Sequence, residues 1–262
     1  MRHALHAEWT KLRTLPSNAW LALAIAGATV AASVAVVWTV DTSHCPSPAE
    51  CFEDTTRLSL TGVRLGQVAV VVLAVGIIGG EYATGLIRAT LAACPQRRTV
   101  LATKAAVLTA TVAVAGAFGV AGALLAGRII LPGNGFSAAN GYPPLSVTDP
   151  ATLRAAAGTV LYLVLVGLLA LGVAVAVRGT AAAVAGVLSL LYLAPVLTEL
   201  VADPDWHDRL AKLAPMTAGL AVQATRDLDR LPVGPWAGLG VLAAWAAAAL
   251  VTGGVLFAAR DQ

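Results

Sequence analysis

Charged side chains are scarce in this sequence. Only 12% of its 262 residues are Asp, Glu, Lys or Arg, whereas soluble domains contain about 25%. Hydrophobic residues make up 58% of the chain, and its mean hydropathy is +0.80. This shortage of charge excludes an ordinary soluble domain and predicts an all-α polytopic membrane protein.

The sequence also lacks the patterns that mark ion coupling or catalysis inside a membrane. The central parts of its apolar runs contain no Asp, Glu, Lys, Arg or His, although ion-driven transporters and channels usually place such residues along their path. It contains no H-E-x-x-H metal motif and no G-x-x-x-x-G-K-[ST] phosphate loop. We therefore predict no catalytic residue and no metal site, and we expect ATP hydrolysis, if needed, from a separate subunit.

Apolar runs long enough to cross a membrane occur six times. A helix needs about 20 apolar residues to cross a hydrocarbon core about 30 Å thick. The second run is uncharged only from Leu65, so it reaches full length by extending back past Arg64, whose side chain would reach the interface. The whole chain, 1–262, is predicted to be a single transmembrane domain. Its expected spans are 20–40, 58–80, 105–127, 155–177, 179–199 and 236–259.

Six spans place both termini on the same side of the membrane. Basic residues number nine on that side and eight on the other, but the segments on the terminal side are much shorter, so their basic density is about twofold higher. Because positive-inside bias is a property of short loops, we expect both termini in the cytosol. The predicted location is the cytoplasmic membrane, crossed several times.

The segment before the first span, 1–19, has the pattern of an amphipathic helix. Leu5, Trp9 and Leu12 share one helical face, whereas charged residues turn away from it. We expect an interfacial helix on the inner leaflet. The alternative is a basic topology signal without any partner. The residues assigned to the interfacial helix are Glu8, Trp9, Lys11 and Leu12.

Two of the three loops expected on the outer side carry specific predictions. In the first, Cys45 and Cys51 could form a disulfide in an oxidising compartment, whereas a metal site that adds His44 has no fourth ligand near in sequence. The last loop, 202–235, has helical character interrupted at Pro215. This pattern indicates a helical hairpin, which could cover the outer mouth of the bundle as a lid or stand in solvent.

The most informative interruption of apolar sequence is the segment 81–104. We expect a short cytosolic helix that begins at Glu81 and Thr84, because the positive end of a helix dipole favours an acid, and that stops at Pro95. Its apolar face could dock on a soluble partner. The alternative is a re-entry loop whose cations contact anionic lipid headgroups. The basic residues expected at the membrane surface after this helix are Arg97, Arg98 and Lys104.

This segment resembles the one after the second span in ABC-2 type exporter permeases, the membrane subunits of type V ABC exporters. The shared pattern is G-E-Y-x-x-G, then leucines, then P-x-R-R and a lysine. The resemblance extends to the amphipathic start, the six-span layout and the stretch LAPMTAGLAV, in a style similar to actinobacterial members. Cys94 departs from it, where a small or polar residue is expected. The matching residues are Gly80, Glu81, Tyr82, Gly85, Leu86, Leu91, Pro95, Arg97, Arg98 and Lys104.

The resemblance implies a permease that forms a homodimer and pairs with two copies of an ABC ATPase subunit. ATP and Mg would bind to that partner, and this chain would bind no cofactor and would not be an enzyme. The cytosolic helix would act as a coupling helix seated in a groove of the ATPase. The residues implied in coupling are Glu81, Tyr82, Gly85, Leu86, Arg88, Leu91, Pro95, Arg97 and Arg98.

The apolar character of the spans favours a hydrophobic or amphipathic substrate over a sugar or an ion. We therefore expect efflux of a drug, an antibiotic or a lipid, with antibiotic resistance as one outcome. Membrane lipids and this substrate complete the expected partners, and no nucleic acid is among them. The alternative hypothesis is a non-transporting scaffold or sensor that uses the same cytosolic helix to anchor a soluble protein.

Overall fold

The computed structural model describes residues 10, 16–42, 54–86, 90, 96–142, 145–201 and 203–259. All regular secondary structure in these ranges is helical. The α-helices are α2 (Pro16–Thr39), α3 (Thr55–Ser59), α4 (Val63–Ala83), α6 (Arg97–Ile130), α7 (Pro150–Val177), α8 (Thr180–Leu188), α9 (Ala194–Glu199), α10 (Pro204–Leu213), α11 (Pro215–Leu220) and α12 (Pro235–Ala259). A π-helical turn, Ser189–Leu193, joins α8 to α9, and 3-10 turns occupy Leu131–Asn134, Ala138–Asn140, Ala221–Gln223 and Leu228–Arg230.

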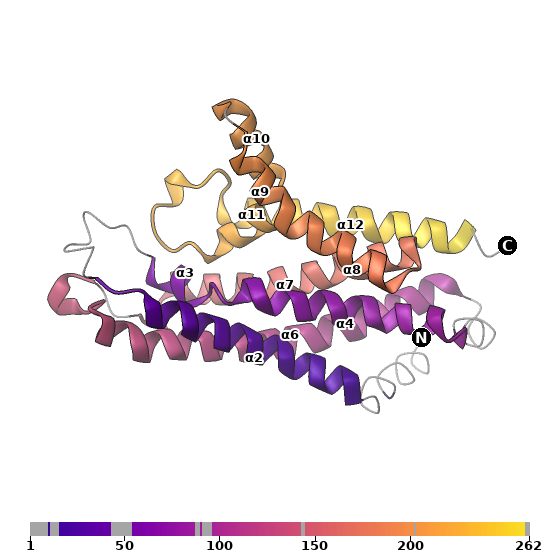
Figure 1. Ribbon diagram of the computed structural model, residues 1–262, viewed down its shortest axis with the longest axis horizontal. Coiled ribbons are helices and arrows are strands. Elements are labelled where there is room, and N and C mark those ends of the chain that lie inside the picture. The colour runs from indigo at the N-terminus through magenta and orange to yellow at the C-terminus, as the bar shows by residue number, and fades with distance from the viewer. Residues whose placement is uncertain are drawn as a thin grey trace.

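The long helices form an elongated bundle (Figure 1). Helices α4 and α7 lie at its centre: α7 packs against α4, α6, α8 and α12, while α4 also contacts α2 and α8. Within the described ranges, six helical segments are long and apolar enough to cross a membrane, and α8, the π-helical turn and α9 together form one of them. In this part of the chain the protein is thus an all-α membrane protein with six helical segments of spanning length.

Two helices begin at other residues than expected. The second span was expected from about Leu58, but α4 begins at Val63, because the chain first forms α3 and then turns. At that turn the Gly62 amide donates a 3.1 Å hydrogen bond to the hydroxyl of Ser33 on α2. The third span was expected from Ala105, but α6 begins at Arg97, so the polar turns before the apolar run belong to the same helix.

The fifth span contains a local change of helix type. Its π-helical turn, Ser189–Leu193, ends two residues before Pro195. Proline has no N–H and its ring clashes with the carbonyl four residues earlier, which here belongs to Leu191. A wider turn at this place accommodates the proline without ending the span.

Small residues set the closest helix contacts. The pair Gly62 and Gly66 faces α2, where an added Cβ on Gly66 would lie 3.2 Å from the carbonyl oxygen of Ile25. In contrast, a Cβ on Gly76 or Gly80 would meet nothing within 4 Å. Gly62 and Gly66 therefore allow α2 to approach closely, whereas no described part of the chain packs against Gly76 and Gly80 on α4.

Helices α7 and α12 approach until their backbones touch. A Cβ added to Gly172 would lie 2.5 Å from the carbonyl carbon of Ala249, and one added to Gly253 would lie 2.5 Å from the carbonyl oxygen of Gly172. Real Cβ atoms essentially never come that close. The two glycines are therefore needed for this helix pair to pack as it does.

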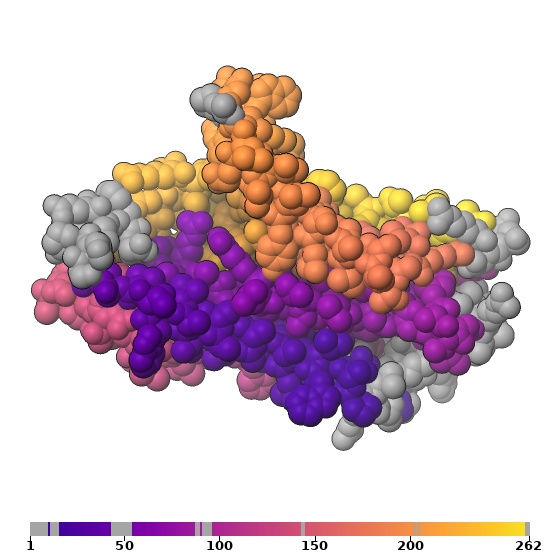
Figure 2. Space-filling view, in the orientation of Figure 1, coloured from indigo at the N-terminus to yellow at the C-terminus, as the bar shows by residue number. Residues whose placement is uncertain are grey.

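The loop 202–235 was expected either to cover the bundle or to stand in solvent, and its two helices differ in this respect. Helix α11 is inserted in the bundle, where Met216 and Leu220 join the main hydrophobic core. Helix α10 projects sideways from the molecule (Figures 1 and 2), and its apolar residues Trp206 and Leu213 are exposed. The loop is a helical hairpin with one packed helix and one projecting helix.

Asp54 joins the start of α3 to the loop 202–235. Its carboxylate caps α3 by accepting hydrogen bonds from the amides of Thr56 and Arg57. It also accepts bonds from the amide and hydroxyl of Thr225 and from the amide of Arg226. This partly buried carboxylate thus connects parts of the chain 171 residues apart.

Several predicted features lie outside the described residues. They are the interfacial-helix residues Glu8, Trp9, Lys11 and Leu12 and the possible disulfide between Cys45 and Cys51.

Candidate functional site

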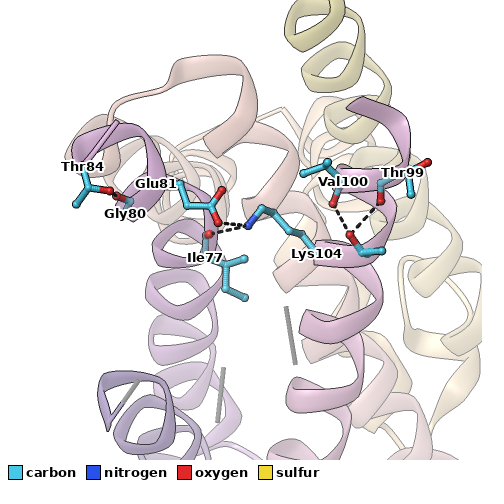
Figure 3. Close-up of polar contacts among 8 residues, drawn as sticks. Ile77, Gly80, Glu81, Thr84, Thr99, Val100 and Lys104 are labelled. Carbon is cyan, nitrogen blue, oxygen red and sulfur yellow. Dashed lines mark hydrogen bonds and ion pairs between the residues drawn. The ribbon is translucent and has the colours of Figure 1, made fainter. Parts of the chain in front are cut away.

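The segment 81–104 is held at both ends by a buried ion pair. The Lys104 ammonium on α6 lies 2.8 Å from Oε1 of Glu81 on α4. It also donates a 3.4 Å hydrogen bond to the carbonyl of Ile77, one turn earlier on α4. Figure 3 shows the lysine side chain reaching across from α6 to this last part of α4. The two helices that flank the segment are therefore fixed to each other at this level.

Burial makes this pair necessary. The side chain of Lys104 is 0% exposed and that of Glu81 10% exposed. Removing one partner from a buried pair leaves an uncompensated charge and commonly costs about 3–5 kcal/mol. The carboxylate also sits at the negative end of the α4 dipole, which disfavours an acid there, and the lysine offsets this effect.

The structure corrects two expectations for the segment. Glu81 does not begin a cytosolic helix: it lies in the last turns of α4, which ends at Ala83. Lys104, which was expected beside the basic pair Arg97 and Arg98, is not exposed like Arg98: its side chain is buried between α6 and α4. The sequence pattern misled because an acid after an apolar run resembles a helix start. Here the acid, Glu81, is still part of α4, and its charge is paired with Lys104, which lies 23 residues later in the chain.

The chain leaves α4 through Gly85. This residue has φ +70°, in the left-handed region that glycine adopts without steric cost, and a Cβ there would meet nothing within 4 Å. The backbone of Leu86 is again helical, and its side chain is 56% exposed. Gly85 therefore separates α4 from the exposed start of the connecting segment.

Other predicted residues contact neighbouring helices at the same end of the bundle. The Arg178 guanidinium, just after α7, lies 5.6 Å from the ring centroid of Tyr82. The Arg97 guanidinium donates a 2.7 Å hydrogen bond to the carbonyl of Phe257 on α12 and lies 5.7 Å from that ring. These contacts join the ends of α4, α6, α7 and α12.

The remaining predicted residues fall into two groups. Arg98 is exposed beside Arg97. The other group comprises Arg88, Leu91 and Pro95, which lie outside the described residues.

Sequence analysis missed a buried polar cluster nearer the other end of the bundle. Gln67 on α4 is fully buried. Its amide oxygen accepts a hydrogen bond from the hydroxyl of Tyr162 on α7, and its amide nitrogen lies 3.2 Å from the sulfur of Met216 on α11. The signal was present, because Gln67 is an amide side chain within an otherwise apolar run. The cluster fixes α11 to the two central helices.

The described ranges contain no group of three His, Cys, Asp or Glu residues placed to hold a metal ion. The polar geometry found at the segment 81–104 suits structural fixation and charge pairing.

The fold and this site define a multi-pass membrane protein with six helical segments of spanning length. No protein-family model matches the chain, and no curated protein matches it either. The class therefore rests on the helices themselves.

Proposed function

We propose that this chain is the permease subunit of an ATP-driven exporter of the ABC-2 type. It would form a homodimer, pair with two copies of a separate ABC ATPase and move a hydrophobic or amphipathic molecule across the cytoplasmic membrane. Both termini and the segment 81–104 would face the cytosol. ATP and Mg would be bound by the ATPase.

The Glu81–Lys104 ion pair carries this proposal. A coupling segment can transmit force only if its ends are attached firmly to the helices that must move. Here the ion pair fixes the end of α4 to the start of α6, while Arg97 attaches α6 to α12. A displacement of the segment would therefore reach three spans together.

The exposed start of the segment is the surface on which we propose that the partner docks. Beyond the ion pair, Gly85 turns the backbone, and Leu86 presents an apolar side chain to the surroundings. A firmly held base with an exposed apolar start suits a short helix that is seated in a groove of a soluble protein. The resemblance of G-E-Y-x-x-G to exporter permeases supports an ATPase as that protein.

Copurification tests the partner. The full chain, tagged and extracted from its native membranes in mild detergent, should retain a protein with a phosphate-binding loop. After reconstitution in liposomes, amphipathic compounds should stimulate ATP hydrolysis by the complex. If an associated ATPase showed no stimulation by any such compound, the substrate class would be wrong.

A matched pair of glycine variants tests the coupling segment. Gly85→Val should uncouple ATP hydrolysis from transport, because valine strongly disfavours the left-handed backbone of this position. Gly80→Ala is the control: the position is helical and its Cβ would meet nothing within 4 Å, so coupling should persist. Equal transport by both variants would contradict the coupling role. Retention of a kinase or a transcription regulator in place of an ATPase would instead favour the scaffold or sensor.

A further inference from the structure

A cleft of about 580 Å³ opens between α6 and α12 at the bundle end where α6 begins and α12 ends. Its volume lies within the range of small-molecule sites, about 300–1,000 Å³. The two helices contact each other sparingly, although Arg97 bonds to the carbonyl of Phe257. The cleft is therefore a gap between two spans that are joined at one end.

The cleft is lined by basic side chains at one end and by apolar side chains along the rest of its wall. Arg97 and Arg98 supply two guanidinium groups at the start of α6. Apolar side chains, among them Leu101, Val251 and Val255, supply most of the remaining wall, and no acidic side chain is among the described residues that line it. A cavity with cations at one end and an apolar wall matches an anionic amphiphile.

The local electrostatics favour an anion beside these arginines. Arg97 already binds the negative end of α12 through the Phe257 carbonyl, whereas Arg98 is exposed. Gln96 at the N-cap of α6 makes no side-chain capping bond, so the positive end of the α6 dipole adds to the charge of the arginines. A phosphate held here would contact the more available guanidinium.

We propose that this cleft binds a single anionic phospholipid. Its phosphate would bind Arg98, and an acyl chain would lie along the outward side chains Val251 and Val255 of α12, which are 65% and 61% exposed. The bound lipid would fill the gap between α6 and α12. This inference rests on the charge and the apolar wall of the cleft and does not require the exporter function.

Native mass spectrometry of the purified full chain tests the site. We would titrate it with phosphatidylglycerol and, separately, with phosphatidylcholine, which has the same phosphate but no net charge. A basic side chain near a lipid headgroup contributes about a fivefold change in binding. Phosphatidylglycerol should bind several-fold more tightly than phosphatidylcholine, and Arg98→Ala should weaken it about fivefold.

Control variants and a competitor distinguish lipid binding in the cleft from a general effect of charge, from loss of folding and from binding of a free anion. Arg128→Ala removes an exposed arginine from the other end of α6 and should leave binding unchanged. Gly254→Leu should weaken both lipids, because Gly254 lines the cleft and a larger side chain would enter it. A thermal transition measured on each variant checks that folding is retained. Excess inorganic phosphate should fail to displace phosphatidylglycerol.

Equal binding of the two lipids would overturn the proposal, as would equal losses in Arg98→Ala and Arg128→Ala. Displacement of phosphatidylglycerol by inorganic phosphate would also overturn it, since the site would then recognise a free anion rather than a lipid.

Discussion

Lys104 is completely buried, and its ammonium lies 2.8 Å from the carboxylate of Glu81. The contact joins two spans at the point where the chain leaves the first and enters the second. If one of the two charges were removed, water could not solvate the other, so the stability effects of the two residues should be coupled.

We expect Lys104→Ala to lower the free energy of unfolding by about 3–5 kcal/mol, because Glu81 would be left as a buried charge without its cation. The double variant Glu81→Leu, Lys104→Met should recover most of that loss. Unfolding in mixed detergent micelles provides the measurement, and Arg98→Ala, which changes an exposed cation, is the control. The coupling would be contradicted if the loss in the double variant equalled the sum of the losses in Glu81→Leu alone and Lys104→Met alone.

The Gln67–Tyr162 hydrogen bond predicts a second non-additive pair. Gln67→Leu should cost about 1–3 kcal/mol, because the Tyr162 hydroxyl would be buried without its acceptor. Adding Tyr162→Phe should restore part of the loss. Thr111→Val is the matched control, since its hydroxyl bonds only to the Val107 carbonyl of its own helix. Thermal transitions of the three variants measure the effect, and a larger loss in the double variant than in Gln67→Leu would argue against it.

The contact between Gly172 and Gly253 predicts a steric effect. Alanine at either position should destabilise the protein by about 1–3 kcal/mol, because the new Cβ would force the α7 and α12 backbones apart. Gly240→Ala on α12 adds the same atom where nothing lies within 4 Å. It should be neutral or slightly stabilising, since alanine favours a helix. Equal stability of all three variants would show that α7 and α12 are not in backbone contact.

Asp54 and Asp149 allow a comparison of two helix caps. Each carboxylate accepts a hydrogen bond at its helix N-terminus, but only Asp54 also binds Thr225 in the loop 202–235. Asp54→Ala should therefore expose that loop to proteolysis, whereas Asp149→Ala should cost only the cap, about 1 kcal/mol. Limited proteolysis and thermal transitions separate the two effects. Cleavage at equal rates in both variants would mean that Asp54 does not hold the loop.

The number and approximate positions of the spanning segments could be predicted because each is a long run of apolar residues. Hydropathy has no information on where a polar turn joins such a run, so the starts of α4 and α6 were misplaced. The wider turn before Pro195 was equally invisible, although the proline that explains it was visible in the sequence.

Within the site, sequence patterns singled out Glu81, Tyr82 and Arg97 but could not show their contacts. A pairing such as Glu81 with Lys104 depends on how two helices rotate and approach, and helical periodicity describes only one helix at a time. Gly172 was hidden for a different reason. In a chain with 25 glycines, spacing alone does not distinguish a glycine in backbone contact from one that faces open space.

Between α7, which ends at Val177, and α8, which begins at Thr180, only Arg178 and Gly179 connect the chain. Arg178 has φ +60° and its guanidinium also lies against Tyr82. So short a link leaves no slack between the two helices. We therefore expect a tilt of α7 to move α8 directly and, through α9, to move the projecting helix α10. A spectroscopic label on α10 should then report motions that begin at the opposite end of the bundle.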